Sequence, residues 1–231
     1  LFNFLGHYGV QAFIVISAYG LTLSWQNKST GYGRYLAHRF AKLYPSLVLA
    51  GLVFVLFTLI FTGSFPLSEQ WKDLGIQLTL FANLVPGKAM AISGPWWFYS
   101  FIFGFYLVFP LMIWIFRRFS WPGLVGMTIL GYLFAILLYK PMTAVQLNPY
   151  MFFLGHMPEL CLGIFLALKP DLRMPWWILL LSLVLVAGGN TWEWLWPFAN
   201  LGMAILLITG IQWLIRRKSR MKLFLSRVRF L

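Results

Sequence analysis

Long apolar stretches separated by short basic loops run along the whole chain. Segment 66–94 is the one long region that does not have the pattern of a span, and its apolar side predicts an interfacial helix. We therefore expect an all-α polytopic transmembrane helix bundle that forms a single membrane domain over residues 1–231. About seven membrane spans are predicted, at residues 9–25, 43–65, 95–116, 121–139, 151–168, 175–190 and 194–215.

Positive charges fall mainly on one side of this predicted bundle. The seven spans place all Lys and Arg residues on that side except Lys72, Lys88 and Lys140. Basic residues in short loops resist transfer across a bilayer, so the basic side is predicted to be cytoplasmic. The tail at 216–231 interleaves cations with apolar residues, which predicts a basic amphipathic segment on the inner leaflet, in contact with membrane lipids.

Composition excludes an ordinary soluble globular domain. Apolar residues make up 61% of the chain and charged residues 10%, with a mean hydropathy of +0.79. The net charge of +13 lies in short loops between apolar stretches. This distribution fits anionic lipid headgroups, and we expect no nucleic-acid partner. The single cysteine, Cys161, lies in a predicted span, so no disulfide framework is expected.

Arg39 and Lys42 form a basic pair just before the second predicted span. Their spacing of three residues places them on one side of a helical turn. Pro45 follows, and it is expected in the first turn of the next helix, where its missing N–H costs nothing. The pair suits a phosphate-bearing cytosolic ligand, but the residues alone favour a topology signal with headgroup snorkelling.

His156 and Glu159 are the most informative polar residues within an apolar stretch. Their i, i+3 spacing predicts a shared helix face. An ionisable residue at that depth is costly and therefore suggests function, as an acid/base couple or as a site for sugar hydroxyls. In the alternative interpretation, a cation or an amide from another helix holds Glu159 and merely fixes the packing. No metal site is expected, because the three histidines are predicted at different membrane levels.

Four segments of the sequence carry a resemblance to a known family: GVQAFIVISAYGL, HRFAKLYP, WFYSFIFGFYLVFP and HMPELCLG. Together they resemble the acyltransferase-3 family, the integral-membrane acyltransferases that O-acylate bacterial carbohydrates and related acceptors. Ala18 stands where that family commonly has Gly, Lys42 replaces the second Arg of an RxxR pair, and His156 replaces the Arg of RxPEFxxG. At Ile102 and Gly104 the chain lacks a polar residue that some members carry.

The resemblance implies acyl-CoA, usually acetyl-CoA, as the co-substrate, bound from the cytoplasm by Arg39 and Lys42. It implies a hydroxyl of a cell-surface carbohydrate or lipid-linked glycan as the acceptor. Trp97, Ser100 and Tyr106 match the family in register and are expected to bind substrate.

Glu159 and His156 are the expected catalytic residues within this chain. The resemblance implies that the family's catalytic histidine lies in an initial membrane helix, and we expect that helix and the family's last helix to lie outside this sequence. We therefore expect a central fragment, inactive alone, of an O-acyltransferase of the bacterial inner membrane.

Two other classes of function remain open. A proton-coupled transporter or a flippase-like bundle would use the same intramembrane Glu159 and His156 as a proton or substrate site. A structural membrane subunit would use them only to hold helices together. Inverted repeats would favour transport, and the two halves of the sequence share no matching motif. Dependence on acyl-CoA would favour the enzyme.

Overall fold

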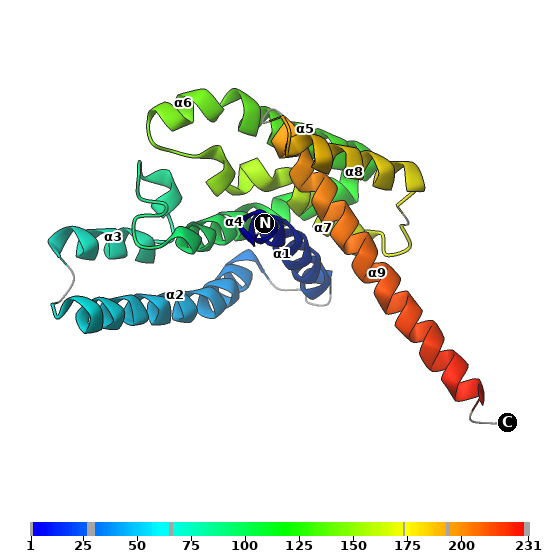
Figure 1. Ribbon diagram of the computed structural model, residues 1–231, viewed down its shortest axis with the longest axis horizontal. Helices are drawn as coiled ribbons and strands as arrows, with labels where there is room; N and C mark the ends of the chain where they lie inside the picture. The colour runs from blue at the N-terminus through cyan, green and yellow to red at the C-terminus, as the bar shows by residue number, and fades with distance from the viewer. Residues whose placement is uncertain (1, 27–30, 65–66, 173, 193–194, 229–231) are drawn as a thin grey trace. The chain divides into compact units, whose positions relative to one another are not determined.

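The computed structural model describes residues 2–26, 31–64, 67–172, 174–192 and 195–228, and within them the side chains from Tyr8 to Trp213. The described residues form helices and turns and contain no strand, which confirms the all-α class. The chain divides into two compact units, one of residues 24–158 and one of residues 1–23 with 159–231 (Figure 1).

The unit of residues 24–158 consists of α-helices and short 3₁₀ helices. It contains α2 (Tyr32–Thr62), α3 (Ser68–Leu78), η1 (Ala82–Leu84), η2 (Gly94–Trp96), α4 (Trp97–Phe119), α5 (Trp121–Leu137), α6 (Tyr139–Ala144), η3 (Pro149–Met151) and η4 (Phe153–His156). Two of its segments are long and apolar enough to cross a membrane, Tyr32–Thr62 and Gly94–Phe119. Since the other apolar helices that meet this test of composition are shorter, the count of seven spans stays a prediction.

The basic stretch before the second predicted span is helical and continuous with that span. The helix α2 begins at Tyr32, after Gly31 in an extended conformation, and runs for 31 residues. Pro45 therefore lies inside α2, and the expectation that it opens a new helix is wrong. A proline removes one backbone hydrogen bond, and the packing of Leu43, Tyr44 and Leu47 in one apolar cluster keeps the helix together there.

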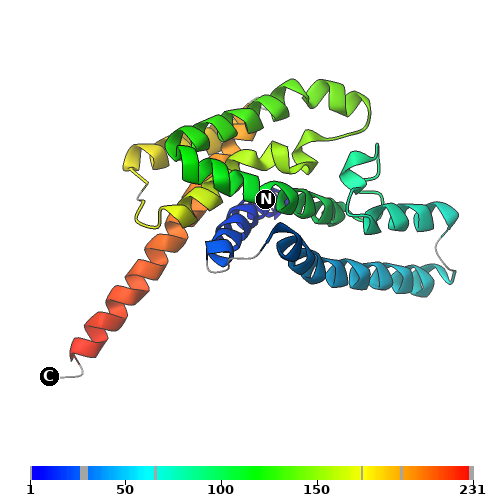
Figure 2. The ribbon, with the colours of Figure 1, turned by 180° about the vertical axis from the view of Figure 1, so that it is seen from behind.

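The helix α3 turns back along α2. Gly63 ends α2 in the left-handed conformation, with φ of 66°, and the chain reverses within a few residues. A Cβ atom on Gly51 of α2 would lie 3.2 Å from Cδ1 of Leu74 of α3, and both views show the two helices side by side (Figures 1 and 2). Leu74 is buried in this contact, whereas Trp71 on the same predicted apolar side is 46% exposed. The position of segment 66–94 at a membrane interface stays a prediction.

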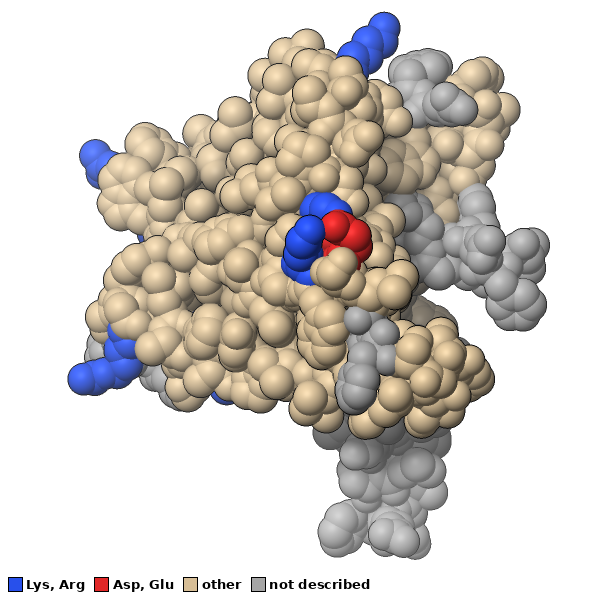
Figure 3. Space-filling view, turned by 90° about the vertical axis from the view of Figure 1, so that its left-hand side faces the viewer, with Lys and Arg blue, Asp and Glu red and all other residues tan. Residues whose placement is uncertain are grey.

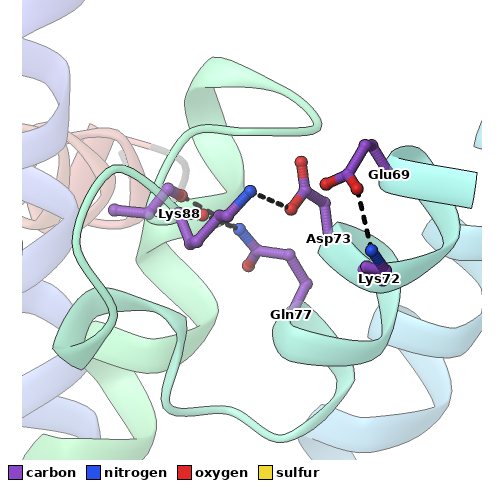
Figure 4. Close-up of polar contacts among 6 residues, drawn as sticks. Glu69, Lys72, Asp73, Gln77 and Lys88 are labelled. Carbon is purple, nitrogen blue, oxygen red and sulfur yellow. Dashed lines mark hydrogen bonds and ion pairs between the residues drawn. The ribbon is translucent and has the colours of Figure 1, made fainter.

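Polar contacts fasten the loop after α3 to that helix (Figure 4). Lys88 Nζ lies 2.6 Å from Oδ1 of Asp73, whose side chain is only 14% exposed. The buried Gln77 donates from Nε2 to the carbonyl oxygens of Lys88 (2.8 Å) and Ala89 (3.1 Å). A single amide nitrogen therefore satisfies two carbonyl groups that would otherwise cost free energy to bury.

A second ion pair lies on the exposed side of α3. Lys72 donates to Glu69 at 2.8 Å, and this hydrogen bond lowers the pKa of the Glu69 carboxyl group and raises that of the Lys72 ammonium group. Both side chains are about two-thirds exposed, so solvent screens the pair. Figure 3 shows one face of the molecule, on which basic and acidic side chains meet in one cluster and the other charged side chains are few and isolated, as expected for a surface in contact with lipid.

The helices α4 and α5 are joined by a single residue. Ser120 has φ of 48°, and its N–H donates to the Phe116 carbonyl oxygen. The helix α4 therefore ends at Phe119, with Arg117 and Arg118 in its last turn. Further along α5, Gly131 lies against the segment that enters α7 (Met157–Leu168). A Cβ atom there would lie 2.5 Å from Cβ of Met157 and 2.8 Å from Cδ of Pro158.

The other unit contains α1 (Phe2–Gln26), α7, α8 (Trp176–Gly189) and α9 (Trp196–Val228). Small residues permit close packing in it: Gly189 faces Ala199, and Gly202 faces the backbone of Ser182, which join α8 and α9 into a hairpin. Tyr8 of α1 donates to Oδ1 of Asn190 at 3.2 Å. The predicted basic tail at 216–231 lies outside the described side chains.

Two glycines of α5 provide a matched test of this packing. Gly131→Ala is expected to destabilise the protein by about 1–3 kcal/mol, because the new methyl group meets Met157 and Pro158. Gly126 lies in the same helix with nothing within 4 Å of a Cβ atom, so Gly126→Ala should be neutral or stabilise by about 0.5–1 kcal/mol. Thermal unfolding of both variants in detergent measures the difference, and equal midpoints would contradict the close contact.

Candidate functional site

One polar centre surrounds the guanidinium group of Arg39 on α2. Its Nη2 donates to Oγ of Ser24 at 3.1 Å, and its Cζ lies 5.7 Å from the ring centroid of Tyr35 and 5.9 Å from that of Tyr106. Both ring faces attract a cation. We refer to Arg39, Ser24, Tyr35 and Tyr106 as the Arg39 centre.

Aromatic packing fixes the position of this centre. Tyr35 lies one helical turn before Arg39 on α2 and is buried. Its ring contacts Trp25 edge-on, with centroids 4.9 Å apart, and stacks on Phe109 at 6.0 Å. Tyr32 donates to the carbonyl oxygen of Leu107 at 3.0 Å, which fastens the first turn of α2 to α4.

The Arg39 centre contacts α4 near the middle of that helix, at Tyr106. Tyr106 precedes the basic end of that helix at Arg117 by eleven residues, a rise of about 16 Å. Residues 24–158 contain only two acids, Glu69 and Asp73, and both are paired with lysines. Among the described residues, Nε of Arg39 and the hydroxyl of Tyr35 are buried without a hydrogen-bond partner. The centre therefore combines a cation with unused donors and suits an anionic ligand.

Lys42, the other predicted phosphate-binding residue, is exposed on the surface of α2. Arg39 contacts rings of α2 and α4, whereas Lys42 has no side-chain bond to any of the described residues. The structure therefore places the two predicted residues three positions apart on one helix, with different surroundings.

A second centre surrounds His156, which is 3% exposed at the end of η4. Its Nε2 lies 2.9 Å from the carbonyl oxygen of Tyr150. A carbonyl only accepts, so Nε2 carries a proton, and in the neutral ring Nδ1 is the acceptor. The ring lies nearly parallel to Trp97, at 6.1 Å between centroids, and edge-on to Phe101 at 5.5 Å. These four residues form the His156 centre.

Asn83 of η1 positions the Trp97 side of this centre. Its Nδ2 donates to the carbonyl oxygens of Trp97 and Met151, and its side chain is 4% exposed. It thereby connects the start of α4 to η3, which carries Tyr150. Asn83, Tyr150 and Tyr35 were not predicted from the sequence. Only Tyr35 carried a signal, its spacing of four residues from Arg39.

The three predicted substrate-binding residues all lie on α4, but at two levels. Trp97 belongs to the His156 centre and Tyr106 to the Arg39 centre, nine residues apart, a rise of about 14 Å. Ser100 is buried between them along the helix, and its Oγ has no hydrogen-bond partner among the described residues. Their contact with a substrate stays a prediction.

The comparison with known families decides the assignment. The family model described as "Acyltransferase domain" (Acyl_transf_3) matches residues 1–227. The chain belongs to the acyltransferase-3 family. No curated protein and no solved structure matched the chain. The family match confirms the resemblance noted in the sequence and supports a membrane acyltransferase that uses an acyl donor.

In this family member Glu159 lies in the unit of residues 1–23 and 159–231. It occupies the first turn of α7 and is 2% exposed. A carboxylate in a first helical turn is stabilised by the helix dipole, which reduces the cost of its burial. One turn later, Gly163 lies against Val15 and Ala18 of α1, where no larger residue fits. The predicted coupling of Glu159 with His156 stays a prediction.

No group of three or more His, Cys, Asp or Glu side chains that could hold a metal ion occurs among the residues that the structure describes. Cys161 is buried as a free thiol.

Asn83→Asp tests the support of the His156 centre. Aspartate has nearly the same shape, but its carboxylate only accepts, so it would face two carbonyl oxygens and repel both. We expect the free energy of unfolding to fall by at least about 2 kcal/mol, because a buried charge without a hydrogen-bond donor is costly. Thermal unfolding in detergent measures this loss, and Asn148→Asp, which keeps the acceptor of Asn148 for Tyr150 N–H, is the control. A wild-type midpoint for Asn83→Asp would contradict the described bonds.

Proposed function

We propose that this acyltransferase-3 family member is a multi-pass membrane O-acyltransferase of a bacterial inner membrane. In this proposal it transfers an acetyl group from acetyl-CoA to a hydroxyl of a cell-surface carbohydrate or lipid-linked glycan. The observation that carries the proposal is the family match over residues 1–227. The surroundings of the motif residue Arg39 support it, because they offer hydrogen-bond donors and aromatic ring faces and contain no acid of residues 24–158.

The Arg39 centre supplies the chemistry for binding the donor. A guanidinium group pairs with phosphate oxygens through charge-assisted hydrogen bonds, and its unused Nε and the Tyr35 hydroxyl add donors. No acid of residues 24–158 competes for the guanidinium group, because Glu69 and Asp73 are paired elsewhere. Lys42 remains the second proposed phosphate contact, at the surface.

The His156 centre supplies a base for the acceptor. In the proposed step, Nδ1 of His156 takes the proton of the acceptor hydroxyl as that oxygen attacks the thioester carbonyl carbon. The carbon–sulfur bond breaks, the thiolate of CoA leaves and takes up the proton, and an ester remains on the acceptor. Trp97, Ser100 and Tyr106 are the proposed substrate contacts, and Glu159 is proposed as a buried carboxylate in the same proton transfer.

The first experiment measures transfer of label from radiolabelled acetyl-CoA to cell-envelope carbohydrate in membranes that contain the full-length gene product. Arg39→Ala is expected to raise the KM for acetyl-CoA about 10- to 100-fold, the equivalent of losing one or two hydrogen bonds to a charged group. Arg34→Ala removes an exposed cation from the same helix and serves as the control. Equal KM values for the two variants would exclude Arg39 as the donor site. Absence of label transfer by the native protein would favour transport, and proton-coupled uptake would then be measured.

His156→Gln separates catalysis from structure. The glutamine amide nitrogen can still donate to the Tyr150 carbonyl oxygen, as Nε2 does, but it has no basic nitrogen in place of Nδ1. We expect kcat to fall at least about 100-fold, the usual contribution of a general base, with the unfolding midpoint near that of the native protein. An unchanged kcat would show that His156 contributes only packing and its hydrogen bond to Tyr150, and that it is not the general base.

A further inference from the structure

An open groove lies on the outside of α2, away from the Arg39 centre. Its volume is about 580 Å³, and one wall is formed by Ala50, Val53 and Phe57 of α2. Ile92 and Trp96, from the loop before α4, form the facing wall. An apolar cavity of about 150 Å³ holds one benzene molecule, so this groove has room for a considerably longer hydrocarbon. We refer to it as the α2 groove.

The surroundings of the α2 groove are those of a surface in contact with lipid. Val53 is 56% exposed and Phe57 is 58% exposed, as are many apolar side chains on the neighbouring turns of α2. The segment belongs to one of the two helices with the length and composition of a membrane span. From Ser46 to Phe57 the groove follows eleven residues of helix, about 16 Å, which matches an extended alkyl chain more closely than a compact ligand.

A cation lies in line with one end of the groove. Lys42, Ser46, Ala50, Val53 and Phe57 recur at spacings of four, four, three and four residues, which places them on one stripe of α2. Lys42 is exposed one turn beyond Ser46, the last groove residue in that direction. Both acids of residues 24–158 are paired with Lys72 and Lys88, so no acid of this unit neutralises Lys42 in the part that the structure describes.

We propose that the α2 groove binds an anionic phospholipid, with one acyl chain between α2 and the loop at Ile92 and Trp96, and the headgroup phosphate at Lys42. The mainly apolar walls favour a hydrocarbon chain, and the order of cation, hydroxyl and apolar stripe matches the order of phosphate, ester and chain in such a lipid. Phosphatidylglycerol has this chemistry. The groove shares no residue with the Arg39 and His156 centres. Lys42 is common to this site and to the proposed donor contacts, and lipid binding there does not depend on acetyl transfer.

Native mass spectrometry of the detergent-purified chain with added dioleoyl phosphatidylglycerol tests the proposal, with dioleoyl phosphatidylcholine as the zwitterionic reference. Val53→Trp fills the groove and should reduce bound phosphatidylglycerol at least tenfold. Leu52→Trp is the matched control, because Leu52 is the adjacent residue, is 57% exposed and does not line the groove. Lys42→Gln should abolish the preference for phosphatidylglycerol over phosphatidylcholine and leave chain binding in place.

Three results would overturn the proposal. Equal losses in Val53→Trp and Leu52→Trp would mean that the lipid covers α2 without a defined site. Equal retention of both lipids by the native chain would exclude a role for Lys42 in headgroup recognition. Displacement of phosphatidylglycerol by an equimolar polyprenyl phosphate would assign the groove to an isoprenoid chain in place of a phospholipid.

Discussion

The guanidinium group of Arg39, which contacts α4 about 16 Å from the basic end of that helix, is the constraint on which the packing of α2 and α4 depends. Partial burial of such a charge is costly unless other groups replace the lost solvation. Here the replacements are two tyrosine ring faces and one serine hydroxyl, without a carboxylate. Tyr35 in turn is held by Trp25 and Phe109. An anion that binds beside Arg39 would complete an arrangement that the protein leaves electrostatically open.

Buried amides and close glycines hold the remaining loops, in addition to the partly buried ion pair of Lys88 with Asp73. Gln77 and Asn83 each use one amide nitrogen to bond two carbonyl oxygens, and together they fasten the irregular segment between α3 and α4. Gly131 allows the segment before α7 to approach α5. In a low-dielectric environment, hydrogen bonds from neutral donors stabilise the fold more than exposed ion pairs do. A neutral amide costs less free energy to bury than a charge, and its hydrogen bonds fix the orientation of the groups that it joins.

The sequence was sufficient to predict the all-α class, the family and Arg39 as a notable cation, because apolar runs and local motifs report such properties directly. It did not predict that α2 continues through Pro45, since a proline in a helix is tolerated only where tertiary packing compensates. It also missed the packing of α3 on α2, which depends on Gly51 and Leu74, and the pairing of Trp97 with His156, 59 positions along the chain. Contacts over such separations leave no periodic signal.

The two levels of α4 have a consequence for the distance that an acyl group must travel. The hydrocarbon core of a bilayer is about 30 Å thick. Tyr106 and Trp97 mark the Arg39 and His156 centres and differ by about 14 Å along the helix. On the proposed function, less than half of the membrane thickness separates donor phosphate from acceptor. A donor with a flexible arm spans such a gap while its charged end stays at one level, so the protein needs no alternating access to move an acyl group outward.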